Sequence, residues 1–163
     1  MTNKITVRTA TPSPLDGVQL STVDEDSIRR LVHGFYDAVR RDDVIGPIFL
    51  QKIAPGRWPF HLNRMCDFWS SVLLRSGRYH GQPLPPHLRL PGLSDIHFAR
   101  WLGLFRTTAR QVFDEADATI VIATAERIAQ SFRIAVAVHH GEDSIALRPL
   151  TEDPMPDKQG EPT

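Results

Sequence analysis

The sequence predicts an all-α domain between two polar arms, and two observations carry this prediction. Apolar residues recur at helical spacing in four long segments, and no segment alternates apolar and polar residues as a half-buried strand does. The chain of 163 residues has the length of one domain with one substantial core. Residues 1–22, rich in Thr, Ser and Pro, are expected to form a flexible arm, and the acidic, Pro-containing residues 141–163 a disordered tail. The helical domain is therefore expected to span residues 23–140.

The first helix is expected to begin within "STVDEDS", where Thr22 and Glu25 have the three-residue spacing of a capping box. The segment "RRDDVIGP" ends this helix, and "PIFLQKI" predicts a short helical turn. A second helix is expected from "WPFH" to about Arg75, because Pro59 suits a first helical position. The apolar face of the first helix carries Ile28, Leu31, Val32, Phe35 and Val39, with Tyr36 on its edge, and one stripe of the second carries His61, Met65, Phe68 and Val72.

A proline-rich segment, "YHGQPLPPHLRLPG", separates the second helix from the third. Proline fixes φ and removes a backbone donor, so no long helix can cross this segment. The segment nevertheless presents His87 between two apolar residues, Leu84 and Leu88. The third helix is expected to begin at Ser94, a favourable N-cap residue, and the fourth to run over about residues 117–138. The apolar face of the third helix carries Phe98, Trp101, Leu102, Phe105, Ala109 and Val112.

Composition and charge argue against several classes of protein. The 19 Lys and Arg residues balance the 19 Asp and Glu residues, so no strong field favours nucleic acid or an acidic membrane. A single cysteine, Cys66, excludes an intramolecular disulfide and fits a reducing compartment. No apolar run reaches membrane-spanning length, and the first residues lack the apolar core of a signal peptide. We therefore expect a cytoplasmic protein with no membrane span and no nucleic-acid partner.

Four side chains with polar groups stand where a plain core would have apolar ones. Tyr36, His61 and Trp101 lie on or beside the apolar faces of three helices, and His87 lies on its stiff turn. A haem would explain all four, because its iron takes an axial ligand that is commonly a histidine. It also needs a large apolar slot and a few hydrogen-bond donors on the opposite, distal side.

Each of these side chains also has a simpler interpretation. A tyrosine at a helix edge can keep its hydroxyl in water, and a tryptophan among phenylalanines is most simply part of the core. A histidine on an apolar face is more often a satisfied core residue than a ligand. His97 lies three residues into the third helix, where its ring can bond to the helix cap, and it rivals His87 for the ligand role. The remaining histidines, His33, His80, His139 and His140, are expected at the surface, and Cys66 as a small, half-buried filler.

The motifs "GFYDAVRRDDVIGPIF", "HLNRMCDFWSSVLL", "GRYHGQPLPPHLRL", "HFARWLGLF" and "AERIAQSF" follow one another in the order and spacing of a known family. They resemble the bacterial group III truncated haemoglobins over about residues 24–138. The resemblance implies a truncated globin: a two-over-two helical sandwich with a shortened proximal helix and haem b (iron protoporphyrin IX). It implies that His87 of "PPHL" is the proximal iron ligand and that Tyr36, His61 and Trp101 form the distal, ligand-binding side. The residues expected to bind the cofactor are His87, Phe49, His61, Met65, Phe68, Trp69, Leu84, Leu88, Trp101 and Phe105, with Arg64 and Arg89 as candidate partners of the propionates and His80 near them.

These expectations give a leading function and two alternatives. The leading function is binding of O2, NO, CO or similar ligands at ferrous iron, with slow release because two distal donors would hold the ligand. Slow release favours sensing, scavenging or redox chemistry, such as nitric oxide detoxification, over transport. An unidentified external reductase would be needed, since the chain has no flavin or nicotinamide motif. One alternative is a haem peroxidase-like enzyme with His61 as acid–base, and the other is a haem-free helical domain that only binds partners.

Overall fold

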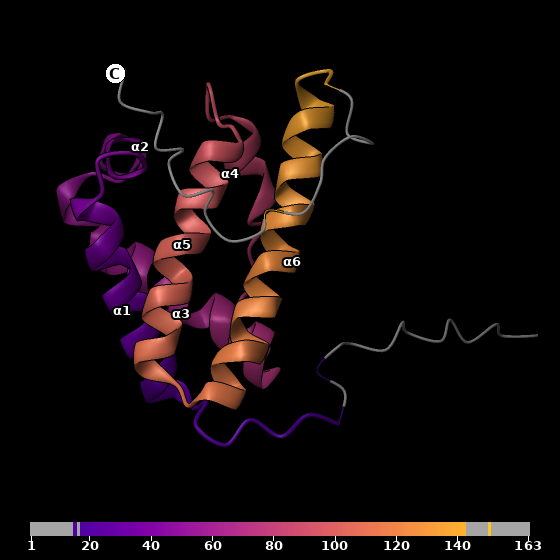
Figure 1. The fold of residues 1–163 in the computed structure, drawn as a ribbon. Helices are drawn as coiled ribbons and strands as arrows, with labels where there is room; N and C mark the ends of the chain where they lie inside the picture. The colour runs from indigo at the N-terminus through magenta and orange to yellow at the C-terminus, as the bar shows by residue number, and fades with distance from the viewer. Residues whose placement is uncertain (1–14, 16, 143–149, 151–163) are drawn as a thin grey trace, which may run out of the picture.

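A computed structural model describes residues 15, 17–142 and 150, and within these ranges the chain is helical without strands. Four long helices, α1 (Glu25–Arg41), α3 (Trp58–Leu74), α5 (Asp95–Val112) and α6 (Glu115–His139), make the body of the molecule (Figure 1). The short elements are α2 (Gly46–Lys52), a 3-10 turn at Pro55–Arg57 and α4 (Leu84–Leu88). The predicted all-α class is confirmed. No helix in the described part is both long and apolar enough to cross a membrane.

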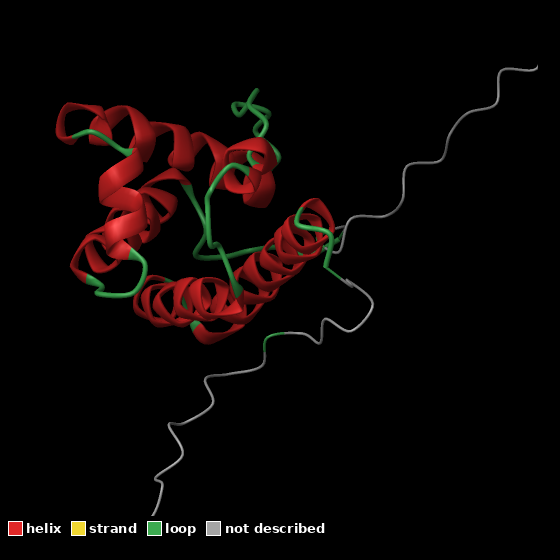
Figure 2. Cartoon of the chain, turned by 90° about the horizontal axis from the view of Figure 1, so that it is seen from above, coloured by secondary structure: helices red, strands yellow, loops and turns green. Residues whose placement is uncertain are grey.

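The long helices pack as two pairs. Helix α1 packs against α3 and against α5, and α5 packs against α6. The short α4 lies against α6, so the proline-rich turn reaches the second pair. Seen from above, the helices surround a central region that loop segments cross (Figure 2).

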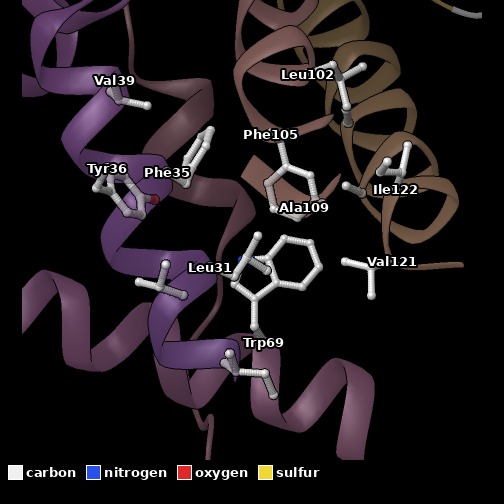
Figure 3. Close-up of a cluster of buried hydrophobic side chains, with 14 of the residues drawn as sticks. Leu31, Phe35, Tyr36, Val39, Trp69, Leu102, Phe105, Ala109, Val121 and Ile122 are labelled. Atoms are coloured by element: carbon white, nitrogen blue, oxygen red, sulfur yellow. The ribbon is translucent and has the colours of Figure 1, made fainter. Parts of the chain in front are cut away.

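An aromatic stack lies between the two pairs (Figure 3). Phe105 of α5 stacks on Trp69 of α3 at a centroid distance of 4.9 Å and on Trp101 at 5.2 Å. Phe35 of α1 meets both Trp101 and Phe105 edge-on, at 5.2 and 5.6 Å. Aromatic pairs in these geometries stabilise by ~0.5–1.5 kcal/mol each beyond the area they bury. The stack therefore fixes α1, α3 and α5 relative to one another and sets one wall of the region between them.

The start of α1 differs from the sequence prediction. Asp24, not Thr22, is the N-cap, and it exchanges hydrogen bonds with Ser27 in a capping box. Thr22 instead donates from its backbone N–H and its hydroxyl to one carboxylate oxygen of Asp117, at 2.6 and 2.5 Å. The predicted capping box of Thr22 and Glu25 is therefore wrong, because Thr22 is engaged by a residue 95 positions away. Its bonds tie the end of the N-terminal arm to the first turn of α6.

The other predicted helix ends agree with the structure to within about three residues. Pro59 lies in the first turn of α3, and Arg75, with a left-handed φ of 56°, terminates that helix. Ser94 caps α5 as predicted. Helix α4 has only five residues, which is the short proline-flanked turn that the sequence indicated. Most of the two expected arms lies outside the described residues; Leu150, which is described, packs half-buried against the core.

Candidate functional site

The proline-rich turn holds His87 in one defined orientation. Its Nδ1 lies 2.7 Å from the carbonyl oxygen of Pro83, at the start of the same turn. A carbonyl can only accept, so Nδ1 carries the proton and donates, and Nε2 keeps a free lone pair. Phe132 of α6 packs against the imidazole at a centroid distance of 4.7 Å. Burial lowers the pKa of His87, which keeps the ring neutral at pH 7 and its Nε2 available as a ligand atom.

A second group of aromatic rings lies at the N-terminal end of α3, around His61. The imidazole of His61 meets the Tyr36 ring edge-on at 4.7 Å and the Trp58 ring edge-on at 5.7 Å. The Tyr36 and Trp58 rings are 6.1 Å apart, so the three rings form one cluster between α1 and α3. Phe49 of α2 adds an edge contact to Tyr36 at 5.7 Å. Tyr36 and His61, two of the three residues predicted on the distal side, are thus in contact, whereas the third, Trp101, contacts Phe35 and Phe105.

The His61 ring carries a buried atom that the protein does not satisfy. Its Nε2 has no hydrogen-bond partner within the described part of the chain. Burial, and to a smaller extent the proximity of Arg64 and His87, lowers the pKa of His61 to about 4. His61 is therefore neutral at pH 7. A satisfied core histidine, the simpler interpretation of His61, does not describe this ring.

Two further polar groups lack partners among the described residues. Tyr36 is 6% exposed, and no hydrogen bond to its hydroxyl is present there. Burial raises the pKa of this phenol, so the hydroxyl keeps its proton and can donate. The half-buried Trp101 is held by ring contacts to Phe35 and Phe105, and its indole N–H donates to no described residue. The Tyr36 side chain as a whole is buried, whereas the simpler interpretation placed it at a helix edge.

His97 is engaged elsewhere. Its Nδ1 lies 3.1 Å from the Ser94 backbone nitrogen and 3.0 Å from the Ser94 hydroxyl, as part of the capping box of α5. This contact uses the ring to start a helix, which weakens its claim as a ligand relative to His87. His33, His80, His139 and His140 are exposed, as predicted, and Cys66 is half-buried.

The other residues predicted to bind a cofactor divide into two sets. Trp69 and Phe105 are buried within the aromatic stack, where Phe105 stacks on both Trp69 and Trp101. Half-buried side chains pack around this core, namely Met65, Phe68 and Leu88, and Leu84 is half-buried at the start of α4. Of the predicted propionate partners, Arg64 lies over the Tyr79 ring at 5.6 Å, whereas Arg89 and His80 are exposed.

Trp58 is the site residue that sequence reasoning missed. It is 5% exposed and contacts both His61 and Tyr36. Its position three residues before His61 on one helix was a usable signal, because residues at i and i+3 share a helix face. The adjacent Pro59 indicates the start of the helix but gives no signal for the indole beside it.

Comparison with known proteins identifies the family of this chain. No family model matches the chain. The chain is 35% identical over 118 residues to the curated "Group 3 truncated hemoglobin ctb" of Campylobacter jejuni, a match that covers 71% of this chain and 93% of that protein. The crystal structure of the group III truncated hemoglobin from Campylobacter jejuni superposes with a TM-score of 0.68 at 34% identity, covering 73% of this chain and 95% of that one. The chain belongs to the group III truncated haemoglobins. In this truncated haemoglobin α1 and α3 form one pair of the two-over-two sandwich, α5 and α6 form the other, and α4 is the shortened helix.

Proposed function

We propose that this truncated haemoglobin binds haem b with His87 as the axial ligand and holds small diatomic ligands beside Tyr36, His61 and Trp101. The observation that carries the proposal is the pair of histidines. His87 donates from Nδ1 to Pro83 and so keeps Nε2 free, and His61 has a buried Nε2 without a described partner. Both features suit a group that takes a histidine nitrogen on one side and leaves room for a ligand on the other. When bound, ferrous haem supplies an iron atom with one position for a protein nitrogen and one for a small ligand.

The residues of the chain divide the work of holding this group. Prolines at positions 83, 85 and 86 restrict the backbone around His87, and the Phe132 ring limits the rotation of its imidazole. The aromatic stack and the half-buried Met65 and Phe68 supply apolar surface and exclude water. On the distal side, the Tyr36 hydroxyl and the Trp101 indole are donors whose hydrogen bonds are not used by described residues. Donors in a water-poor site act strongly, because little solvent competes with them.

We propose that two such donors give slow release of O2, with NO and CO as further ligands. Slow release favours scavenging, sensing or redox chemistry such as nitric oxide detoxification, and it argues against transport. Repeated turnover would require electrons from an external reductase, and the reducing cytoplasm is the compartment we propose for it. A haem peroxidase-like activity is the second candidate, since the unpartnered Nε2 of His61 can accept a proton. We rank it second because a pKa of about 4 makes this imidazole a weak base at neutral pH.

The test begins with the absorbance spectrum of protein supplied with haem. We expect a Soret band, and we expect the band to depend on His87 and not on His97. Stopped-flow measurement of O2 dissociation then separates the two candidates when it is compared with the rate of reaction with hydrogen peroxide. Slow O2 release with slow peroxide reduction supports ligand holding, and fast peroxide reduction that His61→Leu abolishes supports the peroxidase. The absence of a Soret band would overturn both and return the chain to a helical domain that only binds partners.

A further inference from the structure

The indole of Trp58 stands between the distal histidine and a cation of another helix. Its edge contact to His61, at 5.7 Å, is on one side. The guanidinium of Arg40, from α1, lies over the indole face with its central carbon 4.7 Å from the ring centroid. Cations attract the electron-rich face of tryptophan more strongly than that of any other aromatic residue. Arg40 thus holds one face of the Trp58 indole, while the indole also contacts His61.

The start of α3 has no side-chain cap, so the packing of Trp58 is what attaches it to α1. Arg57 is the N-cap of α3, and its side chain makes no capping hydrogen bond. Pro59 removes one backbone donor from the first turn but does not attach that turn to the rest of the protein. Trp58 is 5% exposed, whereas its neighbours Pro59 and Phe60 are exposed. The turn that carries His61 is therefore fixed to α1 through the Trp58 indole.

The His61 ring is enclosed on two sides by this arrangement. It lies edge-on to Tyr36 and edge-on to Trp58, and its Nε2 is buried. Rotation of the ring toward solvent must break both edge contacts, and no described hydrogen bond holds it in place. Ring packing alone keeps the imidazole in the pocket.

We propose that Trp58, clamped by Arg40, is a latch that holds His61 in the distal pocket and so sets the rate at which ligands enter. This inference rests on the proposed haem function. Trp58 acts here through His61 and is a positioning residue. Loosening the latch should let His61 swing outward more often, which speeds ligand entry but leaves the donors Tyr36 and Trp101 to hold the ligand. Association and dissociation should therefore respond differently.

The chain supplies a matched control next to the latch. Arg57 lies over the ring of Phe60 at 4.6 Å, which is the same kind of contact at the same end of α3. Phe60 is 65% exposed and directly precedes His61 in the sequence. Phe60→Leu and Arg57→Gln therefore remove an aromatic ring and a cation of the same type without touching the enclosure of His61.

The experiment measures CO rebinding by flash photolysis and CO dissociation by ligand replacement in the haem-loaded full-length chain. Loss of one aromatic contact should raise the association rate of Trp58→Leu by about two- to tenfold. Dissociation should change by less than about twofold, because the donors remain. Arg40→Gln, at an exposed position, should raise association by about twofold, and the two control variants should match the parent. In a His61→Leu background, Trp58→Leu should cause no further change in the association rate, because the imidazole that Trp58 holds is absent.

A readout independent of ligand kinetics is the NMR titration of the His61 ring in the CO-bound protein. If Trp58→Leu or Arg40→Gln frees the ring, its pKa should rise toward the ordinary value of about 6.5, and Phe60→Leu should leave it unchanged. Parent-like association and titration in Trp58→Leu would refute the latch while haem binding stands. Should Trp58→Leu not fold, Arg40→Gln decides the matter, since parent-like behaviour of that variant refutes the clamp. A parent protein that takes up no haem refutes the proposed function itself.

Discussion

Replacing Tyr36 with phenylalanine should affect stability and ligand release in opposite ways. In the protein without ligand, the hydroxyl belongs to a buried side chain and donates to no described group, so its removal takes away a poorly solvated donor without breaking a bond. In the ligand-bound protein, the same removal takes away a donor to a ligand that carries partial negative charge. A hydroxyl with a purely structural role would lower stability when removed and leave ligand release unchanged.

The magnitudes follow from the burial and the missing partner. An unsatisfied buried polar group costs ~1–3 kcal/mol, and the Tyr36 hydroxyl is not completely enclosed, so Tyr36→Phe should raise the free energy of unfolding by no more than about 1 kcal/mol. A hydrogen bond to a charged acceptor contributes ~1.5–3 kcal/mol, so O2 dissociation should become about ten- to a hundredfold faster. The phenyl ring keeps the edge contacts to His61, Trp58 and Phe49, which limits the loss of packing.

Two measurements on one variant decide the prediction. Urea unfolding of the deoxygenated ferrous protein gives the stability change, and stopped-flow mixing with dithionite gives the O2 dissociation rate. Tyr79→Phe is the matched control, because Tyr79 is the only other tyrosine and packs against Phe68 and Arg64 outside the Tyr36 cluster. Loss of more than about 1 kcal/mol of stability with unchanged O2 release would show that the hydroxyl serves the fold and would refute the reasoning.

Three further predictions test the rest of the site. His87→Ala should lose most of its haem, seen as loss of the Soret band, whereas His97→Ala should keep it; the reverse pattern would make His97 the ligand. Trp101→Phe should release O2 about tenfold faster, and its effect should be less than additive with Tyr36→Phe, since both donors address one ligand. The pKa of His61 is about 4 in the folded protein and 6.5 in the unfolded chain, so the unfolded state binds a proton first as the pH falls. Unfolding free energy should therefore decline between about pH 6.5 and pH 4, and His61→Leu should flatten that decline in urea titrations.

Local signals predicted the helices well where the deciding partner was close in sequence. Ser94 begins α5 because its cap partner, His97, is three residues away. Thr22 does not cap α1, because it bonds to Asp117 of another helix. The spacing of residues within one helix cannot predict such a partner. The short α4 was predictable for the same local reason as Ser94, since proline restricts its own residue and the one before it.

The candidate site was predictable in part. Tyr36 and His61 stand out in the sequence itself, because each is a polar side chain that breaks the apolar pattern of its own helix. The role of Trp58 was hidden, because a tryptophan on an apolar face fits a core as well as a site. Its contact with Arg40 joins two helices and depends on the tilt of α1 against α3, which no spacing within either helix contains.

The hydrogen bonding of buried polar side chains elsewhere in the fold supports the proposal of a bound ligand at this site. The other buried polar side chains of the described part each have a hydrogen-bond partner: Ser27, Asp42, Ser70, Arg106, Thr108, Asp117, Thr124 and Arg133. Even the charged Arg133 is matched by both oxygens of Asp95, at 2.8 and 2.6 Å. The buried Nε2 of His61 departs from this rule. An unpaired buried group costs ~1–3 kcal/mol, a large share of the margin by which a domain is stable. A fold that satisfies its other buried polar side chains would not leave this nitrogen unpaired unless a bound group completed it.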